Sequence, residues 1–448
     1  MATSEYQSKT IALLAVGTRG DVQPFLALAL GLQQAGYKPL IISAKNEAAF
    51  VQGFGIPFHA LNVDIQKIMD NQEVHAMAKG DSPLAFAKSH LEGSKALKQT
   101  MVQVQEEIWD ALRNGENNVG AVIFHPGMQN SFLMAQELGL PAMMASPFPF
   151  AATREFPAIL FYGKLRWNGL VGRVLNRSSH ALFEQLFWML GYGAAKEFWK
   201  RQGKSHIPKL TPPSRTRAAR TMLTLMGYSR HIFPRPSDWS ENVALTGYWM
   251  LPNEPDWMPP ADLVQFLEDG EAPVYVGFGS IKDAATFKTT LEIVVQAVER
   301  LGRRAVIALG WSSLPEGVSA TLPKNVFLLS SAPHSWLFPR MAAVVHHGGA
   351  GTTAAGLLAG KPTVIIPHTG DQPAWGLRVW ELGAGGKPIP KKKLSALGLE
   401  ASLREALQPT VVAKASEIGE KLRAESGVQN AVQIISNVLK YNSINQLS

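Results

Sequence analysis

Apolar segments that alternate with helical segments constrain the fold of this chain more than any other feature. In the first half, strand-like apolar segments cover residues 11–16, 39–43, 119–124 and 141–145. In the second half they cover residues 274–278, 305–309, 326–328, 343–345 and 363–366. Continuously apolar strands are typical of parallel sheets, because helices cover both faces of such sheets. The pattern therefore predicts an α/β protein with one parallel sheet in each half of the chain.

A proline-rich segment between residues 234 and 260 separates the two halves. It contains PRPSDWSENV and LPNEPDWMPP, and clustered prolines interrupt helices and strands. We therefore expect a boundary there, with one domain over residues 1–240 and a second over residues 241–425. Two domains of this size suit a chain of 448 residues.

The composition excludes several classes of protein. The chain contains no cysteine, which excludes a disulfide scaffold, a thiol nucleophile and a cysteine-ligated zinc site. No group of residues has metal-ligand spacing, so we expect no metal. The net charge of +8 would suit a nucleic acid, an anionic membrane or a nucleotide. The basic residues are scattered, apart from residues 164–177 and 387–393, and no nucleic-acid-binding motif accompanies them, so we expect no nucleic-acid partner.

The amino terminus is polar and leads straight into an apolar strand. It therefore lacks the features of a signal peptide, and the sequence has no uninterrupted apolar segment of about 18 residues that would span a bilayer. These features predict a cytoplasmic protein.

The segment from residue 342 to residue 373 contains the strongest chemical signal. A β-branched strand leads into two histidines, a turn of small residues and two threonines that open a helix: His346, His347, Gly348, Gly349, Ala350, Gly351, Thr352 and Thr353. Glycines allow the backbone to approach a ligand closely, and the free N–H groups of a first helical turn attract anions. The segment therefore predicts a binding site for a phosphate or diphosphate.

Two polar residues follow the next predicted strand, TVIIP. Asp371 and Gln372 supply a carboxylate and an amide, which are suited to hydrogen bonds with sugar hydroxyls. The alternative is that either residue caps the helix that begins near Pro373.

Three motifs, in this order along the chain, resemble a known family. They are GTRGDVQPFLALALGL at residues 17–32, PHSWLFP at residues 333–339 and VVHHGGAGTT at residues 344–353. They are similar to motifs of the family 1 UDP-glycosyltransferases of GT-B fold, and most similar to the sterol 3-beta-glucosyltransferase branch. The resemblance implies two Rossmann-like domains that face each other across a cleft, with a carboxyl-terminal helix in residues 426–448 that crosses back to the first domain.

The resemblance also implies an activity. It is the inverting transfer of a hexose, with UDP-glucose as the expected donor, to the hydroxyl of a sterol or similar apolar alcohol. The UDP-sugar is a substrate, and no cofactor is expected. Other interpretations stay open: a natural-product or lipid glycosyltransferase acting on macrolides, glycopeptides or hydroxy-fatty acids, a UDP-sugar 2-epimerase, and a non-enzymatic lipid- or nucleotide-binding module. An epimerase would turn over UDP-sugar with no alcohol present.

The resemblance assigns roles to the motif residues. Asp21 matches the catalytic base, and His346 matches the histidine that contacts the donor phosphates. Residues 348–353 and the second glycine turn, in VYVGFGS, would add contacts to the diphosphate, and Asp371 and Gln372 would bind the sugar hydroxyls. Ala332 would pair with the uracil through its backbone, although the usual stacking tryptophan is replaced by Ser331, and Trp311 is a speculative substitute. The residues of the second glycine turn are Gly277, Gly279 and Ser280.

Each of these roles has a structural alternative. Asp21 follows the first strand, where parallel sheets bind ligands, but it could instead cap a helix. Pro24 favours a first helical position, which would make Gln23 the cap and leave Asp21 two residues too early. For His346 and His347, the alternative to a ligand contact is a structural role, in which one imidazole is buried with a backbone partner and the other is free. We expect a structural role for His347 but not for His346. The second glycine turn could be a tight connection only, and Trp336 could be core.

The segment from residue 150 to residue 205 is rich in aromatic residues. Phe148, Phe150 and Phe156 would form an apolar wall that removes water from the Asp21 carboxylate and strengthens it as a base. Residues 182–190 are apolar on nearly all sides of a helix, which indicates a buried helix, an apolar acceptor pocket or a membrane-facing lip. In the last case Arg166, Arg173 and Arg177 would contact anionic lipid head groups, as in a peripheral membrane protein.

Overall fold

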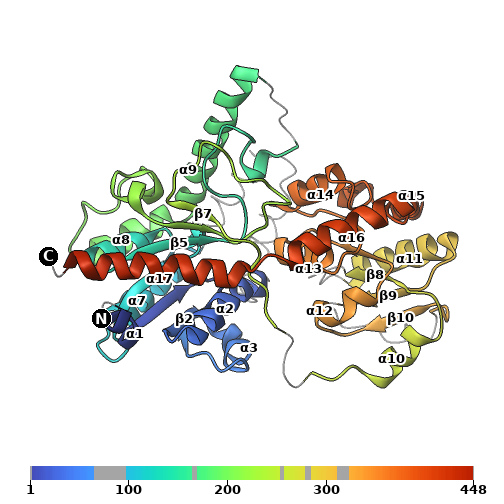
Figure 1. Ribbon diagram of the computed structural model, residues 1–448, viewed down its shortest axis with the longest axis horizontal. Coiled ribbons are helices and arrows are strands. Elements are labelled where there is room, and N and C mark those ends of the chain that lie inside the picture. The colour runs from blue at the N-terminus through green and yellow to red at the C-terminus, as the bar shows by residue number, and fades with distance from the viewer. Residues whose placement is uncertain are drawn as a thin grey trace. The chain divides into compact units, whose positions relative to one another are not determined.

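The computed structural model describes residues 3–64, 97–163, 169–252, 257–277, 284–309 and 322–446. The chain forms two compact units (Figure 1). Unit 1 comprises Met1–Leu251 together with Ser426–Ser448, and unit 2 comprises Pro252–Glu425.

Unit 1 is built on a seven-stranded parallel sheet with the order β3-β2-β1-β4-β5-β6-β7. Its strands are β1 (Thr10–Leu14), β2 (Lys38–Ala44), β3 (Phe58–Leu61), β4 (Val119–Phe124), β5 (Ala142–Ser146), β6 (Thr224–Met226) and β7 (Val243–Leu245). The four strands predicted in this half correspond to β1, β2, β4 and β5. The sequence did not reveal β3, β6 and β7, which are short: β3 (FHAL) contains a histidine, β6 (TLM) a threonine, and β7 (VAL) lies in the proline-rich segment where a domain boundary was expected.

Helices cover both faces of this sheet (Figure 1). They are α1 (Thr3–Ser8), α2 (Arg19–Gln34), α3 (Ala48–Gln52), α7 (Lys98–Arg113), α8 (Asn130–Glu137), α9 (Gly169–Arg201) and α17 (Gly427–Gln446). The last helix packs on α2 at Gly31, where an added Cβ would lie 2.3 Å from Val428 Cγ1. Ile435 and Leu439 of α17 are buried in the same core as Leu32, so the carboxyl-terminal segment is part of unit 1.

Unit 2 is built on a five-stranded parallel sheet with the order β10-β9-β8-β11-β12. Its strands are β8 (Val274–Gly277), β9 (Ala305–Ala308), β10 (Val326–Leu329), β11 (Ala343–His346) and β12 (Thr363–Ile365). The helices are α10 (Ala261–Glu268), α11 (Ala284–Leu301), α12 (His334–Leu337), α13 (Ala350–Leu358), α14 (Gln372–Glu381), α15 (Ala396–Ala406) and α16 (Pro409–Arg423). All five strands were predicted, and the α/β class with two parallel sheets is confirmed.

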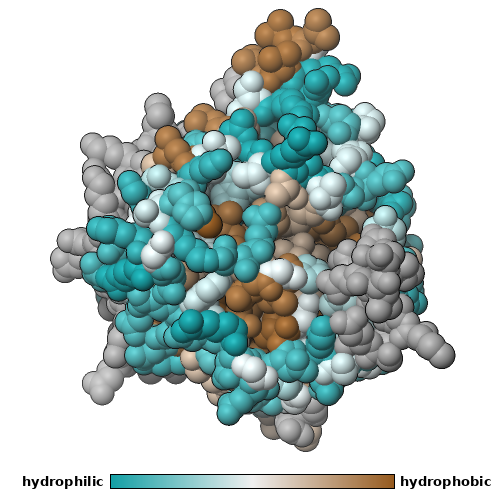
Figure 2. Space-filling model, turned by 90° about the vertical axis from the view of Figure 1, so that its left-hand side faces the viewer, coloured by the Kyte–Doolittle hydropathy of each residue, from teal (hydrophilic) through white to brown (hydrophobic). Residues whose placement is uncertain are grey.

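Helix α9 combines two environments that its sequence did not separate. Phe183, Trp188 and Trp199 are buried, as expected for a core helix. The first turns differ, because Leu170, Val171 and Val174 are 82%, 70% and 62% exposed. This end of α9 extends away from the sheet of unit 1 (Figure 1), and it forms the apolar patch at the top of Figure 2.

A carboxylate on the buried part of α9 makes stability depend on pH. Burial raises the pKa of Glu184 to about 7, although Arg215 lies 4.0 Å away and partly opposes the rise. The folded state therefore binds the carboxyl proton more tightly than the unfolded state does. As the pH rises from about 4.5 through 7, the free energy of unfolding falls by on the order of 3 kcal/mol. Glu184→Gln removes this loss. Its melting temperature should therefore exceed that of the wild type by more at pH 8 than at pH 5.

Calorimetric melts at both pH values check this prediction. Glu197→Gln is the control, because Glu197 lies on the same helix but forms partly exposed ion pairs with Lys98 and Arg201. A difference between Glu184→Gln and wild type that is the same at both pH values would contradict the prediction.

Candidate active site

The turn between β11 and α13 has the geometry of an anion site. Gly348 has a φ of +93°, and a Cβ there would lie 2.6 Å from Ile365 Cγ2, so this position requires glycine. Gly349 is the N-cap of α13 and has no side chain to accept from the first-turn N–H groups. A Cβ at Gly351 would meet no atom of the described residues within 4 Å, so the first turn of α13 borders open space. A phosphate oxygen placed there would accept from backbone N–H groups at the positive end of the helix dipole.

His346 ends β11 with its ring buried, at 2% exposure. Its Nδ1 accepts a hydrogen bond from the Gly348 N–H at 2.9 Å. Burial holds the pKa of His346 well below its ordinary value, and His347 and His334 lower it further. The ring is therefore neutral and carries its proton on Nε2, which has no hydrogen-bond partner among the described residues. The alternative for His346 was a buried imidazole whose hydrogen bonds are satisfied by the backbone. This is true of Nδ1, but no described backbone group bonds Nε2.

His347 is a packing residue rather than a free imidazole. An added Cβ on Gly349 would lie 2.8 Å from His347 Nε2, so the ring covers the N-cap of α13. The ring also lies 6.2 Å from that of His368, a residue that the sequence did not single out. Burial lowers the pKa of His347, and it lowers the pKa of His368 to about 4. Both rings are therefore neutral near pH 7.

Asp371 and Gln372 shape the loop after β12. Gln372 Oε1 accepts from the N–H groups of His368 at 2.7 Å and Thr369 at 3.1 Å, and its Nε2 takes part in neither bond. Asp371 is the N-cap of α14, but its side chain makes no capping bond and instead accepts from Trp375 Nε1 at 2.6 Å. A Cβ on Gly348 would lie 3.1 Å from the Gln372 carbonyl oxygen, so this loop adjoins the glycine turn.

The other donor-side residues are only partly described. Gly277 ends β8 and pairs with His346 across the sheet, and a Cβ there would lie 2.5 Å from the Tyr275 hydroxyl. Gly279, Ser280 and Trp311 lie outside the described residues. Ala332 is half-buried in the loop before α12.

Trp336 matches the sterol-branch motif and is fixed by its neighbours. Its ring lies 5.1 Å from that of Trp257, and the Arg340 guanidinium lies over it at 4.2 Å. These contacts give Trp336 a packing role.

The structure corrects the prediction about Asp21. Helix α2 begins at Arg19, with Thr18 as N-cap, and Pro24 lies inside the helix rather than at its start. Asp21 Oδ2 accepts from the Thr18 N–H at 2.8 Å and from Thr18 Oγ1 at 3.1 Å, which completes a capping box. The expectation that Asp21 is placed too early to cap is therefore wrong. Both bonds use Oδ2, so Oδ1 remains as the carboxylate's second acceptor.

His125, which the sequence did not single out, lies beside this loop. It follows β4, the neighbour of β1, and it is 6% exposed. Its Nδ1 accepts from the Gly127 N–H at 3.2 Å, and its Nε2 has no partner in the described part of the chain. Burial lowers the pKa of His125, while the nearby charge of Asp21 raises it by less. The short motif FHPG was the available signal, since it repeats the His-x-Gly spacing of HHGG.

The three predicted wall residues form two groups rather than one. The Phe148 ring lies 5.9 Å from that of His125 and 6.2 Å from that of Phe150, which is 1% exposed. Phe150 continues this cluster to Phe183 of α9, at 5.7 Å. Phe156 belongs to a second group, in which its ring centroid lies 5.6 Å from that of Phe233. Phe148 and Phe150 therefore extend from His125 towards α9.

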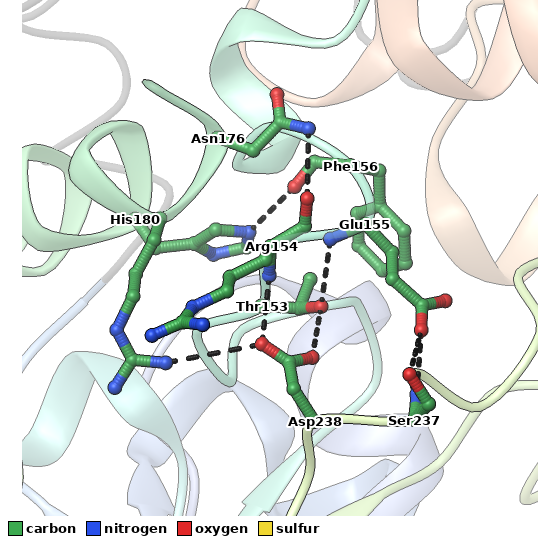
Figure 3. A network of polar contacts seen from close by, with 9 residues as sticks. Thr153, Arg154, Glu155, Phe156, Asn176, His180, Ser237 and Asp238 are labelled. Carbon is green, nitrogen blue, oxygen red and sulfur yellow. Dashed lines mark hydrogen bonds and ion pairs between the residues drawn. The ribbon is translucent and has the colours of Figure 1, made fainter. Parts of the chain in front are cut away.

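A polar network fixes the backbone around Phe156 (Figure 3). Asp238 accepts from Thr153 Oγ1 at 2.6 Å and from the Arg154 N–H at 2.9 Å. The Phe156 carbonyl accepts from His180 Nε2 on α9 at 3.1 Å. Arg177 Nη1 lies 3.8 Å from Asp238, so this network also holds the base of the exposed end of α9.

Comparisons with known proteins give matches in both units of the chain. Residues 11–155 match the Glycosyltransferase family 28 N-terminal domain, and residues 292–438 match the Erythromycin biosynthesis protein CIII-like C-terminal domain. Among solved structures, a glycotransferase of kitacinnamycin has a TM-score of 0.66 at 19% identity and covers 96% of this chain and 98% of its own. The calicheamicin glycosyltransferase CalG4 has a TM-score of 0.63 at 19% identity, with the same coverage. At this identity the likeness shows the fold alone, which is GT-B, as the resemblance implied.

Curated relatives extend the match. A sterol 3-beta-glucosyltransferase of Arabidopsis thaliana is 33% identical over 430 residues, which are 94% of this chain and 67% of the relative. A second from the same plant is 34% identical, over 94% of this chain and 64% of the relative. One from Glomerella lagenarium is 31% identical, over 97% of this chain and 29% of the relative. The chain thus spans about two thirds or less of the length of these relatives. Its identity to them, together with both domain matches and the strand-end site, shows that the chain belongs to the sterol 3-beta-glucosyltransferase family.

Proposed function

We propose that this protein transfers glucose from UDP-glucose to the hydroxyl of a sterol, with inversion at the anomeric carbon. The assignment of a UDP-sugar donor rests on the neutral His346. Its Nε2–H lies at the glycine turn that leads into α13, and no described residue accepts from it. The family carries the acceptor half, because its curated relatives are named for sterols.

The reaction needs one bond formed and one broken. The acceptor oxygen attacks the anomeric carbon, and the bond from that carbon to the UDP oxygen breaks on the opposite side. Asp21 takes the hydroxyl proton, through the Oδ1 that the capping box leaves unused. The negative charge left on UDP is stabilised by His346 Nε2–H and by the first-turn N–H groups of α13. In this assignment, Asp371 and Gln372 bind the sugar hydroxyls, and Ala332 pairs with the uracil.

A product assay tests this function. Purified protein is incubated with UDP-glucose and a panel of sterols, linear alcohols and macrolide aglycones, and glucosides are identified by mass. We expect a steryl glucoside, and Asp21→Asn should lower its formation by about a hundredfold, the usual share of a general base. Glucoside on a non-sterol alcohol alone would replace the acceptor assignment, and turnover of UDP-sugar without any alcohol would indicate an epimerase.

Replacement of His346 tests the donor site. His346→Ala removes the Nε2–H donor and should weaken UDP binding by about tenfold to a hundredfold, the typical cost of a lost hydrogen bond to a charged group. His346→Gln keeps an N–H at a similar distance from the backbone and should restore part of the affinity. Calorimetric titration with UDP measures both variants, and unchanged affinity in a folded alanine variant would show that His346 is a core residue only.

The acceptor of this proposed reaction is a membrane lipid, so we propose a transient contact between α9 and an anionic membrane surface. Leu170, Val171 and Val174 are exposed at its first turns, and residues 169–183 carry arginines but no acidic residue. Arg173 is exposed, whereas Arg177 is ion-paired with Asp238, and Arg166 lies outside the described residues. None of the described helices is long and apolar enough to cross a bilayer. Insertion of apolar side chains beside a basic residue suits a peripheral contact.

Vesicle flotation tests this contact. The wild type should float with anionic vesicles at low salt and be released at high salt, because the attraction to lipid head groups is screened. The triple variant Leu170→Ser, Val171→Ser, Val174→Ser, and separately Arg173→Glu, should stay in solution yet keep activity on detergent-solubilised sterol. Leu397→Ser, at an exposed leucine of unit 2, is the control. Flotation of the triple variant like that of the wild type would contradict a role for α9.

A further inference from the structure

His125 has a buried hydrogen-bond donor that no described residue accepts. Its Nδ1 accepts from the Gly127 N–H at 3.2 Å, so the neutral ring carries its proton on Nε2. No described residue accepts from Nε2, although the atom is shielded from solvent. Buried donors in native proteins are nearly always paired, so a donor that no described residue satisfies can bind a water molecule or a ligand group.

The same arrangement occurs in unit 2. His346 and His125 each stand at the carboxyl end of the strand that neighbours the first strand of its sheet, β11 beside β8 and β4 beside β1. Each Nδ1 accepts from the amide two residues later, and each Nε2 is buried and has no partner in the described ranges. The carboxyl ends of parallel strands are where sheets of this kind bind ligands. The repetition in both units indicates that the unpaired Nε2–H is a binding feature.

The surroundings of His125 indicate what kind of group it binds. The edges of Phe25 and Phe148 pack against the ring, with centroids at 6.1 Å and 5.9 Å, so the site is apolar on these sides. Asp21 is a charged neighbour: it lies in the first turn of α2, the helix that also supplies Phe25, and the His125 N–H donates to the carbonyl of Leu14, the last residue of β1, at 2.9 Å. An anion would be repelled by Asp21, whereas an alcohol oxygen accepts from one group and donates to the other.

We propose that His125 forms the subsite for the acceptor hydroxyl, donating Nε2–H to the alcohol oxygen while Asp21 accepts the hydroxyl proton. This inference rests on the proposed function. The proposal gives His125 the role of hydrogen-bond donor and Asp21 the role of base. The Nδ1 lone pair of His125 already accepts from the Gly127 N–H, so this ring cannot also act as the base. His125 holds the oxygen and thereby directs its proton towards Asp21.

Two polar replacements distinguish this role from a structural one. In His125→Asn, the side-chain oxygen can still accept from the Gly127 N–H, but no donor reaches the position of Nε2. In His125→Gln, the amide N–H reaches approximately that position. We expect Asn to lower kcat/KM for the sterol by about tenfold or more, chiefly through a higher sterol KM, and Gln to recover most of the loss. UDP affinity should be unchanged in both, and the pH profile of the Gln variant should match the wild type because Asp21 remains.

A matched control and the contrary outcomes complete the test. His180→Asn and His180→Gln are the controls, since His180 is buried in the same unit but bonds the Phe156 carbonyl through Nε2. Equal sterol KM values for the Asn and Gln variants of His125 would overturn the inference. It would also be overturned if the rate of the Gln variant no longer fell at low pH, because His125 and not Asp21 would then be the base. If wild-type protein forms no glucoside at all, it is the proposed function that fails.

Discussion

The hydrogen bond from the Gly348 N–H to His346 Nδ1, at 2.9 Å, determines the chemistry of unit 2. It fixes the tautomer, so the buried neutral ring presents a proton on Nε2. It also requires the turn to bend back on itself, which Gly348 allows through its positive φ and its lack of a side chain. The same turn leads into α13, whose N-cap is Gly349, so the first-turn amides follow His346 closely in the chain. One backbone geometry therefore supplies both kinds of donor that a diphosphate needs.

Unit 1 uses the same interaction for another purpose. His125 Nδ1 accepts from the Gly127 N–H, and the neighbouring first turn of α2 contributes the carboxylate of Asp21. Asp21 is held by Thr18 through Oδ2, so its position does not depend on a bound ligand. A donor and an acceptor thus lie together in unit 1, where an alcohol is expected, and several donors lie together in unit 2, where a diphosphate is expected. Under the proposed function, the groups at each sheet suit the ligand expected there.

The sequence predicted those parts whose signal is local and repeated. The apolar segments predict nine of the strands, the edge strands β10 and β12 included, and the residue types of 348–351 predict the glycine turn. The start of α2 was wrong because Pro24 was taken as a first helical residue, whereas the paired bonds between Thr18 and Asp21 stabilise an earlier start. The sequence did not reveal His125, because FHPG is one short match to the His-x-Gly spacing and the importance of this histidine comes from the adjacency of β4 and β1. The exposed turns of α9 share the composition of its buried turns, so only the structure separates them.

The central claim is that His346 is neutral with its proton on Nε2. Nitrogen-15 spectra of protein labelled at histidine report the protonation of each ring nitrogen, and His346→Gln assigns the signal. In protein free of UDP, at pH 7 and again at pH 5.5, we expect an unprotonated Nδ1 that accepts a hydrogen bond and a protonated Nε2. A proton on Nδ1, or a doubly protonated ring at pH 7, would contradict this account.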